Sequence, residues 1–370
     1  MCAKSPALAD LIAAEIADSG PLTFARYMAL ALYHPELGYY ASGRAKIGPA
    51  GDFFTSVSVG PVFGRILAGQ FGEIWQRLGQ PPEFSIVEQG ANDGTLAADV
   101  LNALDPRMNA AYWIIEPSPV LQDRQRAMLQ NHASRVRWVS APEELPVIDG
   151  LHFSNELLDA LPFHLVRSTG SAWEELFVVS EGGRLAFSGG VPTEAVAGEL
   201  TLLPARPAGY IAELRPSASA WAATLGTKIR SGAILVIDYG YSRDQLLAPH
   251  RTEGTFACYR AHQRDALPLE APGEKDITAH VDFTALTEAA AAAGFHREGW
   301  TDQHHFLVGA SQELMREIEG PPTAQTQKIL RTLQTLLHPE SMGTQFHCLL
   351  FTKNLPGPAK LSGFQFARAR

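Results

Sequence analysis

Apolar positions along the chain fall into short runs typical of buried strands, separated by stretches with helical spacing. Five runs predict strands, at residues 84–88, 112–116, 136–139, 151–154 and 233–237. Apolar, β-branched runs of this kind suit parallel strands that helices cover on both faces. Helical spacing follows the first run, over residues 96–104. The pattern therefore predicts an α/β protein built on a doubly wound, Rossmann-like sheet.

The segments outside this alternation predict an extension and an insertion. Two helical stretches, at 6–19 and 23–32, precede the first strand. Between the fourth and fifth strands, two β-rich runs flank Gly182 and Gly183, which is a hairpin signal. The predicted division is an N-terminal helical extension with a lid loop (1–58), a core (59–162 with 211–353), an inserted β substructure (163–210) and a flexible tail (354–370).

The most informative stretch joins the first strand to its helix, from Glu88 through Gly90, Asn92 and Gly94 to Thr95. Glycine allows backbone to approach a ligand closely, and asparagine tolerates left-handed backbone. Three residues separate Gly90 from Gly94, so the loop lacks the G-x-G-x-x-G spacing of dinucleotide sites. The acidic Glu88 disfavours a phosphate and favours a nucleoside with a cationic tail. S-adenosylmethionine fits that description, and these five residues are predicted to line its site.

A second acid, Glu116, ends the second predicted strand. In doubly wound sheets, an acid at this position accepts hydrogen bonds from ribose hydroxyls. The offset from Glu88 is 116 − 88 = 28 residues, close to the roughly 30 that one strand–helix–strand unit needs. One such acid is more often a solvated strand end, but two in consecutive units around a glycine turn favour a nucleoside site. Glu116 is therefore predicted to bind the cofactor.

The fourth strand runs into a polar cluster that contains Asn155, Glu156 and Asp159. Ligands bind beyond the carboxyl ends of strands in such sheets, and residues three apart share one face of a helix. Methyl transfer requires alignment of donor and acceptor and removal of the nucleophile's proton. Glu156 and Asp159 are therefore predicted to be catalytic, and Asn155 to contact the cofactor. Gly51 and Asp52 precede this predicted core and could fold over its site as a lid.

Composition excludes several classes of protein. The 370 residues carry a net charge of −9, which disfavours non-specific binding to nucleic acid. Three scattered cysteines form no C-x-x-C pair, and the twelve histidines show no H-E-x-x-H spacing, so neither a disulfide framework nor a metal is expected. The first twenty residues lack the apolar core of a signal peptide, and no apolar run is long enough to span a bilayer. The expectation is a cytoplasmic protein.

Taken in order, several motifs resemble the MidA-like family of S-adenosylmethionine-dependent methyltransferases, which includes a mitochondrial complex I assembly factor that methylates an arginine. The resemblance covers most of residues 20–350. The matching pieces are Leu32-Tyr33-His34-Pro35 with Gly38-Tyr39-Tyr40, Gly51-Asp52-Phe53 with Thr55-Ser56, the glycine loop through Asp99, Asn155-Glu156-Leu157-Leu158-Asp159-Ala160-Leu161-Pro162, Asp238-Tyr239-Gly240, Gly254-Thr255 with Tyr259-Arg260 and His262, and Gly273-Glu274-Lys275-Asp276-Ile277-Thr278-Ala279-His280-Val281-Asp282-Phe283.

The resemblance implies a class I methyltransferase that acts on an arginine of a protein, such as a respiratory complex I subunit. Glu156 would then hold and polarise the guanidinium, assisted by Asp52 or Asp159, and Gly51 would lie near the cofactor. The chain departs from the family at Asn92 and Asp93, where the family usually has Gly-Arg. That departure motivates an alternative, a non-catalytic assembly factor that binds a respiratory-complex subunit through the methyltransferase fold. A small-molecule methyltransferase also stays open, whereas the loop spacing disfavours a nicotinamide dehydrogenase.

Overall fold

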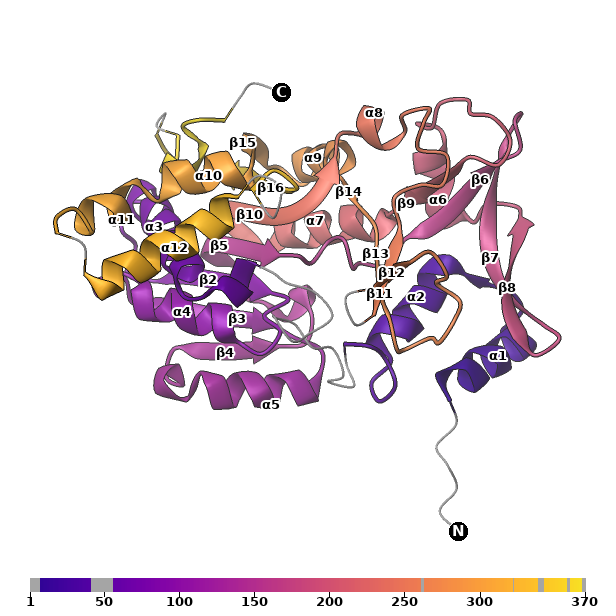
Figure 1. The fold of residues 1–370 in the computed structure, drawn as a ribbon, viewed down its shortest axis with the longest axis horizontal. Helices are drawn as coiled ribbons and strands as arrows, with labels where there is room; N and C mark the ends of the chain where they lie inside the picture. The colour runs from indigo at the N-terminus through magenta and orange to yellow at the C-terminus, as the bar shows by residue number, and fades with distance from the viewer. Residues whose placement is uncertain are drawn as a thin grey trace, which may run out of the picture. The chain divides into compact units, whose positions relative to one another are not determined.

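The computed structural model describes residues 7–40, 56–260, 263–321, 323–338, 343–357 and 360–367 (Figure 1). The chain divides into two compact units. Unit 1 comprises Met1–Phe53, Leu158–Ala220 and Tyr241–Leu286, and unit 2 comprises Phe54–Leu157, Trp221–Gly240 and Thr287–Arg370. The predicted α/β class is confirmed in unit 2, which contains a large and mostly parallel sheet.

Seven strands of this sheet are hydrogen-bonded in the order β15-β16-β10-β5-β2-β3-β4. Their bounds are β2 (Phe84–Gln89), β3 (Ala110–Ile115), β4 (Val136–Val139), β5 (Ile148–Asn155), β10 (Ile229–Tyr241), β15 (His296–Asp302) and β16 (Phe346–Lys353). Neighbours from β4 to β10 run parallel, whereas β16 runs antiparallel to both β10 and β15. The five predicted strands thus all exist, in the doubly wound arrangement expected of a class I methyltransferase.

The connections place a topological switch point beside β2. From β2 the chain moves outward to β3 and β4, then returns to β5 on the other side of β2. Ligands of doubly wound sheets bind at such a switch point, beyond the carboxyl ends of the strands. The glycine loop follows β2 and therefore lies at this position.

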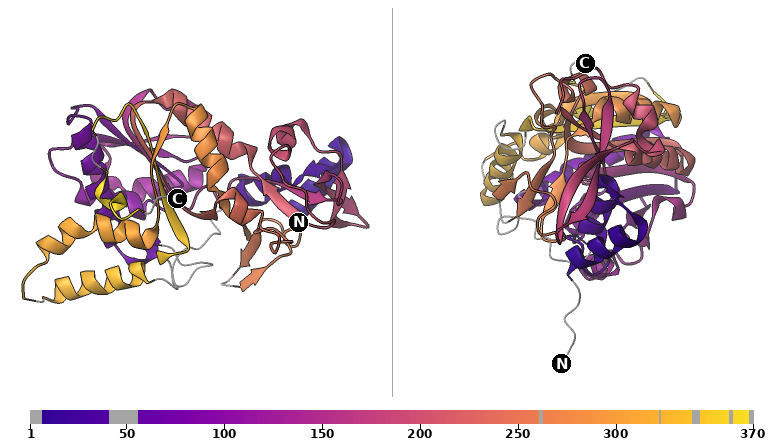
Figure 2. Two further views of the ribbon diagram at one scale, coloured as in Figure 1. Left: turned by 90° about the horizontal axis from the view of Figure 1, so that it is seen from above. Right: turned by 90° about the vertical axis from the view of Figure 1, so that its right-hand side faces the viewer.

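Helices α3 (Val62–Arg77), α4 (Thr95–Ala103), α10 (Gln303–Ala310) and α12 (Ala324–Leu337) share one apolar core with the sheet of unit 2. In this core, Phe71 of α3 packs on Phe153 of β5 with ring centroids 4.9 Å apart. Helices α10 and α12 lie side by side in the orange-to-yellow part of the chain (Figures 1 and 2). The expected flexible tail differs from the structure here, because Leu361 and Phe364 are buried and Phe364 packs on Phe306.

Unit 1 contains a second, antiparallel sheet in the order β1-β7-β6-β9, with β8 paired to β7. These strands are β1 (Leu22–Thr23), β6 (His164–Ser168), β7 (Trp173–Glu181), β8 (Arg184–Gly190) and β9 (Ile211–Leu214). The predicted hairpin is the β7–β8 pair, and its two turn residues, Gly182 and Gly183, have φ of 56° and 78°. Positive φ at both central residues is what a tight hairpin turn requires.

The sequence-based division assigned residues 211–353 to the core, and the structure differs. Residues 241–286 belong to unit 1, together with the N-terminal segment and the inserted strands. The physical reason is a shared apolar core, in which Cys258 and Ile277 are buried with Phe24 of α2 (Phe24–Tyr33) and with Phe163. A small sheet, β12 (Gln263–Asp265), β11 (Ala257–Arg260) and β13 (Asp276–Thr278), is formed in this segment.

The other helices, strands and turns of the described residues are mostly short. They are α1 (Leu8–Ser19), α5 (Pro119–Met128), α6 (Glu194–Leu200), α7 (Pro216–Lys228), α8 (Arg243–Leu246), α9 (Phe283–Ala292), α11 (Gln312–Glu317), β14 (Val281–Asp282) and short 3-10 turns at Ser56–Val59, Gln130–His132, Pro142–Glu144 and Ser362–Phe364.

Candidate functional site

The glycine loop of unit 2 has the backbone conformation that its sequence suggests. Gly90, Asn92 and Gly94 have φ of 84°, 46° and 87°, so three alternate positions are left-handed. The Gly94 N–H donates to the Ala91 carbonyl at 2.8 Å, which closes a turn directly before α4. Left-handed residues turn peptide groups away from the regular strand direction, and glycine does so without steric cost. The loop thus turns peptide groups out of the regular strand path at the carboxyl edge of the sheet.

Asp93, one of the departures from the family pattern, serves a local structural role. Its Oδ1 accepts a hydrogen bond from the Thr95 N–H at 3.0 Å, at the first residue of α4. Helix N-termini leave such N–H groups without partners, and an aspartate there is favourable. The side chain is therefore engaged with the helix end, and the loop accommodates it. Thr95, predicted to contact the cofactor, also lies at this helix start.

Glu88 is buried under the loop, with 2% of its surface exposed. Its Oε2 accepts a hydrogen bond from the Tyr112 hydroxyl of β3 at 2.6 Å. Burial raises the pKa of the Glu88 carboxyl to about 7, although the Tyr112 hydrogen bond acts in the opposite direction. A direct contact between Glu88 and the cofactor stays a prediction.

Glu116 follows β3 at the same edge of the sheet and is 6% exposed. Its Oε1 accepts from the Ser118 N–H at 2.8 Å, and its Oε2 accepts from Nε2 of Gln125 at 3.3 Å. Burial raises the pKa of this carboxyl to about 7, against the effect of these two hydrogen bonds. Each carboxylate oxygen has two lone pairs, so an oxygen with one N–H partner can still accept from a hydroxyl.

The end of β5 brings Asn155 and Glu156 together. Nδ2 of Asn155 donates to Oε1 of Glu156 at 3.0 Å. Glu156 has φ of 56°, a left-handed conformation that is uncommon for a residue other than glycine. Its N–H donates to the carbonyl of Ile237 at 2.9 Å, and the next N–H, of Leu157, donates to Oδ2 of the buried Asp238 at 3.2 Å. Two consecutive residues of β10 thus hold the turn, and strained backbone of this kind clusters at functional sites.

Three buried polar atoms along β5 have no hydrogen-bond partner within the described part of the chain: Nδ1 of His152, Oγ of Ser154 and Oδ1 of Asn155. Buried polar atoms are almost always satisfied in native proteins, by protein, by water or by a ligand. Asn155 lies at the strand end, where a ligand of the switch point would reach it. Its carbonyl oxygen can accept a hydrogen bond from an ammonium or a guanidinium group.

Asp159 belongs to unit 1, where its side chain is buried. Residues 156–162 form a turn, so the prediction that Glu156 and Asp159 share a helical face is wrong. The left-handed Glu156 breaks the helical path at its first residue. The Asp159 carbonyl accepts from Nη2 of Arg215 and from the Ala279 N–H, both at 3.1 Å. A catalytic role for Asp159 stays a prediction, and Gly51 and Asp52 lie outside the described residues.

Sequence reasoning missed two glutamines of this site. Oε1 of Gln89, the residue before Gly90, accepts from Nε1 of Trp221 at 2.9 Å and contacts Nε2 of His152 at 3.2 Å. Gln125 of α5 is fully buried and contacts both Glu116 and the glycine loop. Adjacency to Gly90 could have indicated Gln89, whereas nothing in the local sequence marks Gln125.

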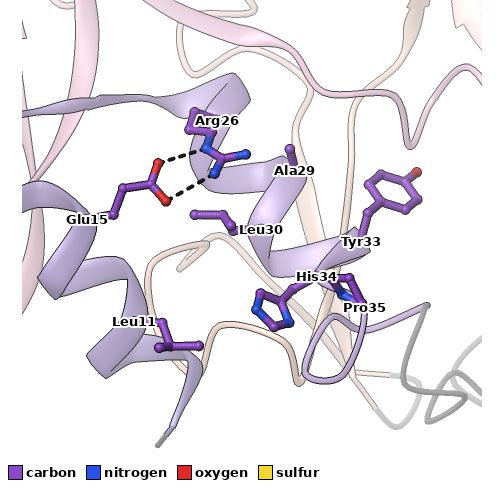
Figure 3. Close-up of a pocket in the computed structure, with 8 residues that line it drawn as sticks. All are labelled: Leu11, Glu15, Arg26, Ala29, Leu30, Tyr33, His34 and Pro35. Carbon is purple, nitrogen blue, oxygen red and sulfur yellow. Dashed lines mark hydrogen bonds and ion pairs between the residues drawn. The ribbon is translucent and has the colours of Figure 1, made fainter. Parts of the chain in front are cut away.

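Unit 1 carries a separate pocket of about 440 Å³ between α1 and α2 (Figure 3). Its lining is Leu11, Glu15, Arg26, Ala29, Leu30, Tyr33, His34 and Pro35. Glu15 and Arg26 form a two-point ion pair across it, at 2.8 and 3.1 Å. Among the predicted site residues that the structure describes, none lines this pocket.

Within the described ranges, no group of three or more histidine, cysteine, aspartate or glutamate side chains is placed to hold a metal ion. Over the same ranges, no helix combines the length and the apolar character that a bilayer crossing requires.

The fold and the site define a class I methyltransferase that uses S-adenosylmethionine. The residues at this sheet edge suit this cofactor, because they combine a left-handed glycine loop, the buried acid Glu116 and the unsatisfied buried acceptor of Asn155. The model of a family described as "Putative S-adenosyl-L-methionine-dependent methyltransferase" matches residues 66–301. The chain belongs to this family.

Solved and curated relatives agree with this assignment. A crystal structure from Burkholderia thailandensis, of a "likely methyl transferase" bound to S-adenosyl-homocysteine, is 32% identical and covers 97% of this chain and 95% of its own, with a TM-score of 0.86. The Drosophila melanogaster "Protein arginine methyltransferase NDUFAF7 homolog, mitochondrial" is 28% identical over 92% of this chain and 84% of the relative. The Homo sapiens protein, NDUFAF7, is 26% identical over 90% and 80%.

These names correct one expectation. The NDUFAF7 relatives from Xenopus tropicalis, Drosophila melanogaster and Homo sapiens are named as mitochondrial proteins, so the expected cytoplasmic location is wrong. The reasoning failed because scattered cysteines and the composition of the first twenty residues do not specify a compartment.

Proposed function

We propose that this methyltransferase acts on an arginine side chain of a protein acceptor, with Glu156 as the residue that binds and polarises the guanidinium. The observation that carries the proposal is the conformation of Glu156 at the end of β5. Its left-handed backbone is anchored by Ile237 and, through the Leu157 N–H, by Asp238, while Asn155 holds one carboxylate oxygen. Such anchoring fixes a carboxylate for a single task rather than leaving it to move in solvent.

The chemistry suits a guanidinium. When bound, S-adenosylmethionine supplies a methyl group on a positively charged sulfur. A carboxylate binds a guanidinium through charge-assisted hydrogen bonds, which orient one nitrogen and draw positive charge away from it. Glu156 would then accept the proton that this nitrogen loses after gaining the methyl group. Asn155, predicted to lie near the cofactor, would support Glu156 through the 3.0 Å contact.

The cofactor would be held by the neighbouring elements. The Gly90–Gly94 loop would face the amino-acid end of the cofactor, and Glu116 would accept from its ribose hydroxyls. Glu88 would support the loop from below through its bond to Tyr112. We infer the protein class of the acceptor from relatives that are named protein arginine methyltransferases. A respiratory complex I subunit is the acceptor that the family resemblance proposes.

The non-catalytic alternative rested on the departures at Asn92 and Asp93. Asn92 adopts the left-handed backbone that glycine would supply, and Asp93 caps the start of α4. Neither residue disrupts the loop, so the enzymatic function is the one we propose.

The test compares wild-type protein with Glu156→Gln, which keeps the side-chain shape but removes the charge. Extract from cells that lack the gene is incubated with methyl-labelled S-adenosylmethionine, and the labelled proteins are hydrolysed to identify methylated residues. We expect labelled methylarginine with wild-type protein and a decrease of roughly 100-fold or more with Glu156→Gln. S-adenosylhomocysteine affinity, measured by calorimetry, should change little.

Glu83→Gln is the matched control, because Glu83 is exposed and directly precedes β2, at the amino end of that strand. It should label acceptors at the wild-type rate. Label in small molecules with none in protein, or undiminished methylarginine formation by Glu156→Gln, would contradict the proposal.

A further inference from the structure

Gln125 of α5 connects two parts of the cofactor site that lie far apart in sequence. Its side chain is fully buried. Nε2 donates to the main-chain carbonyl of Asn92 at 2.9 Å and to Oε2 of Glu116 at 3.3 Å. Oε1 accepts from the indole Nε1 of Trp138, on β4, at 2.9 Å. The single amide group of Gln125 therefore contacts the glycine loop, Glu116 and strand β4.

The orientation of this amide follows from the chemistry of its partners. An indole N–H can only donate, and a carbonyl oxygen can only accept. The Gln125 oxygen must therefore face Trp138, and its NH₂ group must face Asn92 and Glu116. A buried amide is costly unless its polar atoms are paired, so this arrangement resists rotation. The side-chain amide thus satisfies a donor on one side and two acceptors on the other.

The backbone also adapts to this contact. Asn92 has φ of 46°, and its carbonyl is turned to Nε2 of Gln125. A Cβ atom added at Gly94 would lie 3.3 Å from Cα of Gln125, so the helix packs directly on the loop. Through Gln125, helix α5 thus fixes the position of the glycine loop relative to Glu116.

We propose that Gln125 is a positioning residue that couples the glycine loop to Glu116 and holds the Glu116 carboxylate ready for the ribose hydroxyls. The inference rests on the cofactor site described above and does not require Gln125 to touch the cofactor. The neutral amide orients Glu116 without neutralising it. With Ser118 N–H on one oxygen and Gln125 on the other, both oxygens keep a lone pair for a hydroxyl.

The test measures ribose recognition rather than activity. Calorimetry compares S-adenosylhomocysteine with its 2′-deoxy analogue, which lacks one hydroxyl. In buffer alkaline enough to ionise Glu116, wild-type protein should prefer the hydroxylated ligand roughly tenfold or more, as expected for a hydrogen bond to a charged group. In Gln125→Met this preference should fall to within roughly threefold, because the carboxylate is no longer held in place. The affinity for S-adenosylhomocysteine should decrease, whereas the affinity for the deoxy analogue should change little.

Gln122→Met is the matched control. Gln122 lies one turn earlier on α5, and its Nε2 donates to the main-chain carbonyl of Glu116 at 2.7 Å instead of to the carboxylate. It should keep the wild-type preference. Gln125→Leu, which is apolar and cannot donate, is a second variant in case Gln125→Met fails to fold, and it should lose the preference in the same way.

Equal weakening of both ligands by Gln125→Met would overturn the proposal, because it would mean that Gln125 only supports the fold. An unchanged preference in a folded variant would also overturn it. Neither measurement uses an acceptor, so failure of arginine methylation with a normal preference would affect the proposed function and leave this inference standing. Absence of any S-adenosylhomocysteine binding by wild-type protein would contradict the cofactor site itself.

Discussion

Replacement of Glu88 by glutamine should change how the stability of unit 2 depends on pH. Glu88 is 2% exposed, and burial raises the pKa of its carboxyl from 4.5 to about 7. A carboxyl with a raised pKa binds its proton more tightly in the folded than in the unfolded state. The favourable contribution of the Glu88 carboxyl to the free energy of unfolding is therefore present at low pH and is lost as the pH rises from 4.5 through 7. Glutamine cannot titrate, and it can still accept from the Tyr112 hydroxyl.

The size of the effect follows from the pKa shift. One pKa unit corresponds to about 1.4 kcal/mol, so a shift from 4.5 to about 7 amounts to roughly 3 kcal/mol. Part of this difference is already present at pH 5. Between pH 5 and pH 8 the unfolding free energy of Glu88→Gln, relative to wild type, should rise by about 2–3 kcal/mol.

Urea unfolding followed by tryptophan fluorescence measures this difference in the absence of cofactor. Five of the six tryptophans, at positions 75, 113, 138, 221 and 300, belong to unit 2, so the signal reports mainly on that unit. Tyr112→Phe provides a second variant, because loss of the hydroxyl should raise the pKa of Glu88 further and move the pH window upward. Parallel pH curves for wild type and Glu88→Gln would refute the reasoning.

Two further predictions concern the loop and the turn. Gly94→Ala should destabilise unit 2 by about 1–2 kcal/mol, because Gly94 has φ of 87° and a Cβ would lie 3.3 Å from Gln125. Urea unfolding measures the loss of stability, and a variant as stable as wild type would contradict the prediction. Asp238→Ala removes the acceptor of the Leu157 N–H at 3.2 Å. The substitution should lower kcat roughly tenfold or more, because it misplaces Glu156. The affinity for S-adenosylhomocysteine should stay within roughly threefold of wild type. A weaker affinity with unchanged kcat would contradict the role of Asp238 in holding Glu156.

The strands of unit 2 could be predicted because buried parallel strands are short, continuous apolar runs. The run predicted at 84–88 is observed as Phe84–Gln89, and the run at 136–139 is observed as Val136–Val139. Parallel pairing brings their carboxyl ends to one edge, so acids at those ends could be assigned to a common site. For the same reason Glu88 and Glu116 could be found without a structure.

Other features depend on contacts between distant segments. Gln125 sits on a helix among charged residues, and only its contacts with Asn92 and Trp138 show that it is buried. No helix forms directly after Glu156, because hydrogen bonds to β10 hold the backbone of this turn. The spacing of apolar residues around Glu156 does not reveal those bonds. Residues 241–286 join unit 1 through an apolar core shared with the N-terminal helices, and such pairing cannot be read from one segment.

The central claim is that the carboxyl edge of the unit 2 sheet binds S-adenosylmethionine between the glycine loop and Glu116. A crystal structure of this protein with S-adenosylhomocysteine tests it most directly. We predict that the ribose hydroxyls lie within hydrogen-bond distance of the Glu116 carboxylate and that the amino-acid end lies along Gly90–Gly94. A ligand bound elsewhere, or a ribose that Glu116 does not contact, would contradict the account.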